Sequence, residues 1–153
     1  RVIREVASRE RLARLCGFAG LPALDEARRL WRGSSADSAA EVAAGWCWAD
    51  SYPTACYFAV RASGLYRKPP RVVTAEFSEG SAVRLPETGD RLPAVAGEVA
   101  GEYIALKTPA DFSEVGSPQT IAREGGWALV GALTRWPGLM AEEVGKLSRE
   151  GLL

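Results

Sequence analysis

The segment Gly45-Trp46-Cys47-Trp48-Ala49-Asp50-Ser51-Tyr52-Pro53-Thr54-Ala55-Cys56-Tyr57-Phe58-Ala59 carries the signals that decide the fold. Its aromatic start predicts a strand over 46–49, and the polar residues that follow predict a turn. Ser51 is a suitable N-cap and Pro53 suits the first helical turn, so we expect a helix over 54–62 that Gly64 ends. The segment is therefore a predicted strand–turn–helix unit.

The residues before this unit indicate helices and one strand. Arg1–Leu15 has the apolar spacing of an amphipathic helix, and Pro22 is expected to open a second short helix through Arg29. The apolar run Arg29–Gly33 predicts the first strand. Ser38 can cap a helical turn that runs through Glu41.

Beyond the unit, strands with short helices among them are expected. Arg71–Phe77 alternates like a half-buried strand, and Ala82–Leu85 is its predicted hairpin partner. The further predicted strands are Glu102–Lys107, Phe112–Val115 and Gln119–Ala122, with a helix or buried strand over Gly126–Trp136 and a helix over Met140–Leu147. This order predicts a single α+β domain over 1–153, with an N-terminal helical segment over 1–29 and a core over 30–153.

Bulk composition excludes several functional classes. The 153 residues carry 19 basic and 19 acidic side chains, so the net charge is zero and gives no basic footprint for nucleic acid or anionic membrane. No apolar run is long enough to span a bilayer. The chain starts at Arg1 rather than Met, so the N-terminus is expected to be incomplete.

The absence of histidine narrows the possible chemistry. It excludes Ser-His-Asp and Cys-His nucleophiles and histidine-based zinc sites within this sequence. The three cysteines are too few for an all-cysteine zinc site, and their odd number favours reduced thiols in a cytoplasmic setting. We therefore expect no metal, and chemistry that depends on carboxylates, arginines, hydroxyls and backbone groups.

Three motifs in order carry a resemblance to a known family. Trp31-Arg32-Gly33 is followed by Gly45-x-Cys47-Trp48-Ala49-x(4)-Thr54-Ala55-x-x-Phe58-Ala59 and then by Gly101-Glu102-Tyr103-Ile104. The chain resembles the mono-ADP-ribosyltransferases of bacteria and phages, which show an Arg-Gly strand, a Ser-Trp-Thr strand before a helix, and a Glu strand. The resemblance covers Leu30 to Leu106, about half of the chain.

The resemblance implies a split β-sandwich around an NAD cleft, with NAD as the substrate and release of nicotinamide. Glu102 would stabilise the positive charge that develops on the ribose, and Arg32 would hold the phosphates. The implied catalytic residues are Glu102, Arg32 and Cys47, and the implied NAD-binding residues are Arg32, Gly33, Trp48, Tyr52 and Tyr57. The resemblance implies a toxin, an effector or a phage protein that acts in the cytoplasm, in some cases after delivery into a target cell. A protein acceptor is favoured over nucleic acid.

Two departures from the family pattern leave alternatives open. Cys47 and Ala49 stand where the family has Ser and Thr, and a thiol is a poor substitute for the hydroxyl that orients the catalytic Glu. Ala100 stands where arginine-modifying members have Glu or Gln, so an arginine acceptor is not implied. A catalytically impaired relative acting as a binding or inhibitor module is one alternative. A structural protein, with 127–136 as an interface, is the other.

Overall fold

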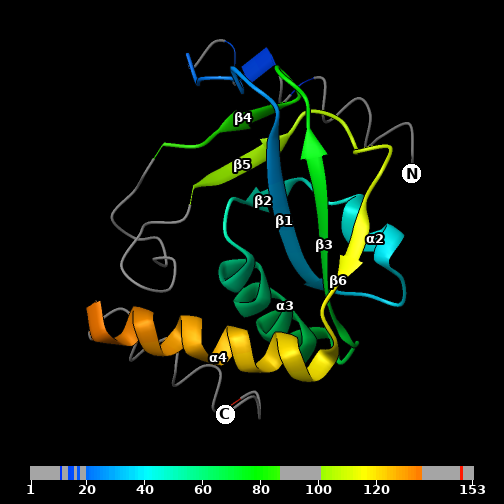
Figure 1. The fold of residues 1–153 in the computed structure, drawn as a ribbon, viewed down its shortest axis with the longest axis vertical. Coiled ribbons are helices and arrows are strands. Elements are labelled where there is room, and N and C mark those ends of the chain that lie inside the picture. The colour runs from blue at the N-terminus through cyan, green and yellow to red at the C-terminus, as the bar shows by residue number, and fades with distance from the viewer. Residues whose placement is uncertain are drawn as a thin grey trace.

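The computed structural model describes residues 11, 14, 15, 17, 20–86, 101–135 and 149, with the backbone alone over 127–135. These residues form an α+β structure built on one six-stranded antiparallel sheet of order β4-β5-β2-β1-β3-β6 (Figure 1). The strands are β1 Arg28–Ser35, β2 Cys47–Ala49, β3 Pro70–Phe77, β4 Ala82–Arg84, β5 Glu102–Ala105 and β6 Ser113–Val115. The helices are α2 Ala39–Ala43, α3 Tyr52–Tyr66 and α4 Pro118–Arg135.

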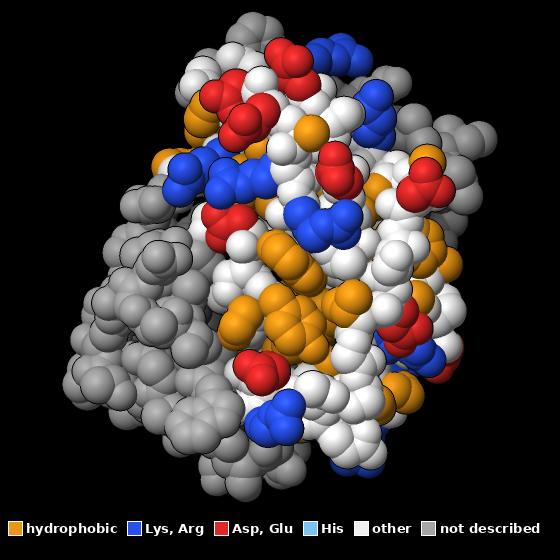
Figure 2. Space-filling model, in the orientation of Figure 1, with side chains coloured by type: hydrophobic (Ala, Val, Ile, Leu, Met, Phe, Trp, Pro, Cys, Tyr) orange, Lys and Arg blue, Asp and Glu red, His pale blue; other side chains and the backbone are white. Residues whose placement is uncertain are grey.

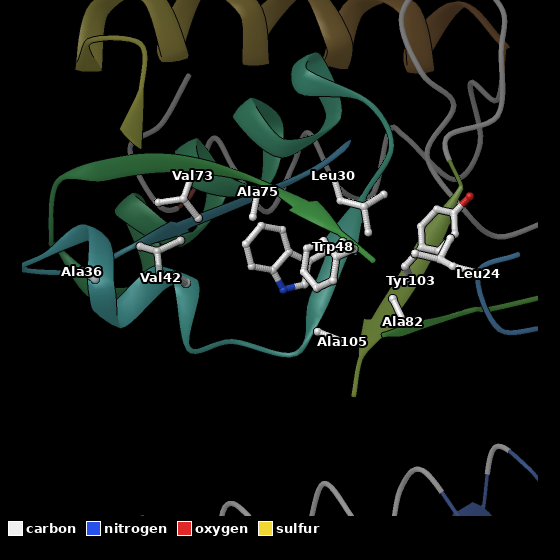
Figure 3. Close-up of a cluster of buried hydrophobic side chains, with 12 residues drawn as sticks. Leu24, Leu30, Ala36, Val42, Trp48, Val73, Ala75, Ala82, Tyr103 and Ala105 are labelled. Atoms are coloured by element: carbon white, nitrogen blue, oxygen red, sulfur yellow. The ribbon is translucent and has the colours of Figure 1, made fainter. Parts of the chain in front are cut away.

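Helices cover both faces of the sheet. On one face, Val42 of α2 joins Leu30, Trp48 and Val73 in the larger buried cluster, which Figure 3 shows on the side of the sheet away from α3. On the other face, α3 and α4 pack together and against β1 and β3. Their smaller cluster has Ile121 of α4 at its centre, and its other members are Ala55, Cys56, Ala59 and Val72. The fold thus has three layers, as burial of both faces of a sheet requires.

The helix starts follow the predicted capping signals. The Ser38 hydroxyl accepts a hydrogen bond from the Glu41 amide, and the Ser51 hydroxyl accepts one from the Thr54 amide. However, α3 does not end at Gly64 as predicted. It continues to Tyr66, and Arg67 caps it in a left-handed conformation with its N–H bonded to the Ser63 carbonyl. A glycine costs a helix interior about 1 kcal/mol, which the packing of α3 on the sheet outweighs.

The predicted second N-terminal helix over Pro22–Arg29 is wrong. Arg28 and Arg29 belong to β1, and Ala23 forms a bridge with Val83 on the outer edge of β4. The Leu24 side chain is buried in the larger cluster, so tertiary packing overrides the local helical signal. In the first predicted helix, residues 11, 14 and 15 are helical, and the rest of Arg1–Leu15 lies outside the described residues.

Two predictions after α3 are also wrong. Strand β4 pairs with β5 rather than forming a hairpin with β3, because both edges of β3 are occupied by β1 and β6. The predicted strand Gln119–Ala122 is the first part of α4. Ser117 and Thr120 exchange side-chain to backbone hydrogen bonds in a reciprocal cap, and Pro118 occupies the first helical position. The region 126–135 is helical, and the predicted helix Met140–Leu147 lies outside the described residues.

Candidate functional site

The sheet is divided between β1 and β2. These strands share one register pair, Trp31 with Ala49, whereas β1 and β3 share eight. The sheet therefore consists of two three-stranded halves, β4-β5-β2 and β1-β3-β6, that meet at this one position. Among the predicted site residues, Arg32 and Gly33 lie on β1, and Cys47, Trp48 and Glu102 lie on β2 and β5, on the two sides of this junction.

Glu102 lies beside this junction. It is the first residue of β5, and it pairs with Ala49, which in turn pairs with Trp31. Residues paired across antiparallel strands project to the same face, so these three side chains form a row on the face that α3 covers. The Glu102 side chain is partly buried. The sequence motifs that were expected to lie together, those of Trp31 and Glu102, are thus brought together here.

Cys47 lies on the same face as Glu102 but not opposite it. Its register partner on β5 is Ile104, and the position opposite Glu102 is Ala49. Two residues along a strand correspond to about 6.6 Å, so the exposed thiol is displaced from the carboxylate by roughly that length. The methyl group of Ala49 takes the place opposite Glu102 in the register, and the predicted catalytic role of Cys47 stays a prediction.

Arg32 projects to the opposite face from Glu102. It follows Trp31 in β1, and side chains alternate along a strand. Its Nε donates to the Val42 carbonyl at 2.9 Å, and its Nη1 donates to the Cys47 carbonyl at 2.9 Å. Gly45 makes room for the guanidinium, since a Cβ there would overlap it. Arg32 therefore ties β1 to β2 across the divided part of the sheet.

Two of the predicted NAD-binding residues, Gly33 and Trp48, have packing roles in this structure. Gly33 lies directly under α3, and a Cβ there would overlap the Ala55 carbonyl oxygen. Trp48 is 1% exposed, donates its indole N–H to the Gly45 carbonyl at 3.0 Å and packs edge-on against Phe77. Trp48 therefore packs in the core, and its predicted role in binding NAD stays a prediction.

The two predicted tyrosines differ in their surroundings. Tyr57 is 4% exposed and packs edge-on against Phe58, so it lies in the interior, and its predicted role in binding NAD stays a prediction. Tyr52, in the first turn of α3, is partly buried and packs against the smaller cluster, as Trp31 and Val115 do. Burial raises the pKa of Tyr52 to about 12, helped by a hydrogen bond with Cys56. The phenol is therefore neutral and fixed between α3 and the start of α4.

Two features of the sheet were missed in the sequence. Arg29 is the one cation that the described strand residues place on the Glu102 face, where its Nη1 donates to Thr74 at 3.3 Å and its Nη2 lies 3.8 Å from Glu76. Asp50 follows Ala49 and bonds to Gly101, directly before Glu102. Because side chains alternate along a strand, Arg29 and Arg32 lie on opposite faces, and this pattern could have identified Arg29. No local pattern in the sequence indicates the contact between Asp50 and Gly101.

Comparisons with known proteins add no family. No protein-family model matches the chain, and neither the curated proteins nor the solved structures provide a significant match. Within the described residues, no cluster of three or more cysteine or acidic side chains is arranged to hold a metal ion. No helix in the same part of the chain has the length and apolar character that a membrane crossing requires.

Proposed function

We propose that the protein is an NAD-dependent mono-ADP-ribosyltransferase that transfers ADP-ribose to a protein acceptor and releases nicotinamide. The observation that carries the proposal is the row Glu102–Ala49–Trp31 at the junction of the two sheet halves. Three motifs far apart in the sequence, each resembling part of this family's pattern, meet there on one face of the sheet. A split sheet with a carboxylate at the split is the arrangement that the resemblance implies.

In the proposed reaction, the bond between nicotinamide and ribose breaks first, and positive charge develops on the ribose. The Glu102 carboxylate would stabilise that charge and accept a hydrogen bond from a ribose hydroxyl, as carboxylates do in glycoside cleavage. Trp31 would form an apolar wall beside the sugar. The acceptor nucleophile would then form the new bond to the anomeric carbon and lose its proton to solvent.

Arg32 has a revised role in this proposal. Its guanidinium bonds the backbone on the face away from Glu102, so it supports the junction rather than the phosphates. Arg29 is the basic side chain of β1 on the correct face to meet a phosphate, and its exposed contact with Glu76 is weak enough to be exchanged. We assign the phosphate contact to Arg29.

Surface charge supports a protein acceptor. Figure 2 shows an apolar area on one face of the molecule with basic and acidic side chains interspersed around it. Binding to nucleic acid calls for a continuous basic patch or stripe, which this face does not display. The zero net charge of the whole chain agrees with that choice.

The decisive experiment measures nicotinamide release from NAD by the purified chain and by the Glu102→Gln variant. The variant keeps the shape of the side chain and removes its charge, so we expect release to fall at least about 100-fold while the protein stays folded. Glu114→Gln, on β6 at the far edge of the sheet, is the matched control and should retain full activity. Equal activity of Glu102→Gln and the wild type would refute the assignment of Glu102.

A second function is favoured by one observation. Ala49, not a hydroxyl-bearing residue, lies opposite Glu102, and the Cys47 thiol lies opposite Ile104. A domain that binds NAD or a protein partner without cleaving NAD would need no orienting hydroxyl. Calorimetry with NAD, followed by the nicotinamide assay, separates the two functions, because binding without release supports the non-catalytic module.

A further inference from the structure

Asp50 and Gly101 form a double hydrogen-bonded contact immediately before Glu102. The Gly101 N–H donates to Asp50 Oδ1 at 2.8 Å, and the Asp50 N–H donates to the Gly101 carbonyl at 3.1 Å. Gly101 is buried and Asp50 is partly buried, so both bonds are shielded from water. The contact extends the pairing of β2 with β5 by one residue past the Ala49–Glu102 pair.

The contact requires a glycine at position 101. A Cβ built on Gly101 would lie 2.6 Å from Asp50 Oδ2 and 3.1 Å from the Tyr103 ring. Both distances are shorter than carbon atoms normally tolerate, so any side chain at 101 would push Asp50 away. The close approach of the Asp50 carboxylate to the backbone therefore depends on the residue types at positions 50 and 101.

Arg28 holds the Asp50 carboxylate from the other side. Its Nη2 lies 3.6 Å from Asp50 Oδ2, its Nη1 donates to the Tyr103 hydroxyl at 2.6 Å, and its guanidinium lies 5.5 Å from the centre of the Tyr103 ring. The Asp50 side chain is 20% exposed, so this ion pair is less screened than an ordinary surface pair. Arg28 on β1 and Tyr103 on β5 thus fix Asp50 between the two halves of the sheet.

The geometry points to Asp50 as a positioning residue for Glu102, an inference that rests on the proposed transferase function. Asp50 alternates with Ala49 on β2, so its side chain lies on the face opposite the Glu102 carboxylate and acts through the Gly101 backbone. It supplies the orientation that Ala49 cannot, because a methyl group offers Glu102 no hydrogen bond. The expected ligand of Glu102 stays the NAD ribose, and Asp50 does not touch it.

The test compares Asp50→Ala, Asp50→Asn and the control Glu114→Ala in the nicotinamide-release assay, using the full chain. Glu114 also pairs with an arginine, Arg71 at 2.6 Å, but in the other half of the sheet. Asp50→Ala removes the acceptor for the Gly101 N–H. We expect kcat to fall about 10- to 100-fold and KM for NAD to change less than about threefold, because misplacing a catalytic group mainly affects the chemical step. Asp50→Asn keeps an acceptor oxygen and should restore most of kcat. Glu114→Ala should match the wild type.

Gly101→Ala keeps the test decisive if Asp50→Ala does not fold. The added methyl group displaces Asp50 without removing it, so kcat should again fall at constant KM, and hydrogen exchange of the amide at 101 should accelerate. A wild-type kcat in both Asp50→Ala and Gly101→Ala would overturn the positioning role, as would equal impairment of Asp50→Asn and Asp50→Ala. Failure of the wild type itself to release nicotinamide would overturn the proposed function, and the positioning role with it, so the two failures are distinguished.

Discussion

Replacing Gly33 by Ala tests how closely α3 rests on β1. A Cβ at position 33 would overlap the Ala55 carbonyl oxygen and lie 3.0 Å from the Ala59 nitrogen. Both atoms belong to the α3 backbone, one turn apart, so no rotation of a side chain can relieve the overlap and the whole helix must move. Gly33 has no left-handed backbone conformation, and the expected effect is therefore purely steric.

The magnitude follows from the cost of overpacking a well-packed interface, which is about 1–3 kcal/mol. Because rigid backbone atoms oppose the new methyl group, we expect the upper end, about 3 kcal/mol. In a domain of this size 1 kcal/mol shifts the midpoint of thermal unfolding by roughly 2–4 °C, so Gly33→Ala should unfold roughly 6–12 °C below the wild type.

Gly126→Ala is the control for the same chemical change. Gly126 lies in α4, and apart from its own helix a Cβ there would meet no atom of the described residues within 4 Å. An alanine in an open helical position should stabilise the protein by about 0.5–1 kcal/mol. Urea unfolding followed by circular dichroism measures both variants. A free energy of unfolding for Gly33→Ala within about 0.5 kcal/mol of the wild type would refute the direct contact between α3 and β1.

The remaining predictions concern Arg32 and Tyr52. A lysine at position 32 cannot donate to two carbonyls as the planar guanidinium does, so Arg32→Lys should lose about 1–3 kcal/mol of stability in urea unfolding. The control Arg29→Lys alters an exposed ion pair and should change stability by less than about 0.5 kcal/mol. Equal effects of the two variants would contradict the role of Arg32 in holding β1 and β2 together. Burial raises the pKa of Tyr52 to about 12 from 10.0 and that of Cys56 to about 11 from 9.0, so above about pH 9 the unfolded chain releases protons that the folded chain retains. These two groups should therefore make stability fall as the pH rises from about 9 towards 12. Tyr52→Phe should reduce this fall relative to the exposed control Tyr66→Phe, as measured by unfolding at a series of pH values.

Local signals predicted local structure well. Ser38 and Ser51 cap helices because a hydroxyl needs only the amide three residues ahead, and the alternation of Arg71–Phe77 gave a strand because each side chain senses its own face. The sequence also contains the two residues of the reciprocal cap, Ser117 and Thr120. Pro118, which follows Ser117, indicates a helix start rather than the predicted strand.

Pairing between strands was not predictable in the same way. The apolar residues of β4 fit a hairpin with β3 as well as they fit β5, and the choice depends on β6 occupying the free edge of β3. Residues 22–24 were expected in a helix, yet they extend along β4 because its outer edge offers unpaired backbone groups and Leu24 reaches the core.

The sequence by itself determined the α+β class, most strand and helix positions near Gly45–Ala59, and the carboxylate on which the proposed chemistry depends. Only the tertiary structure decided that Glu102 lies opposite Ala49 rather than Cys47, that Arg32 braces the sheet from the other face, and that Asp50 holds Gly101. The reason is physical. A side chain's face follows from alternation along one strand, but its neighbours follow from the register between strands, which is set by contacts between residues far apart in the chain.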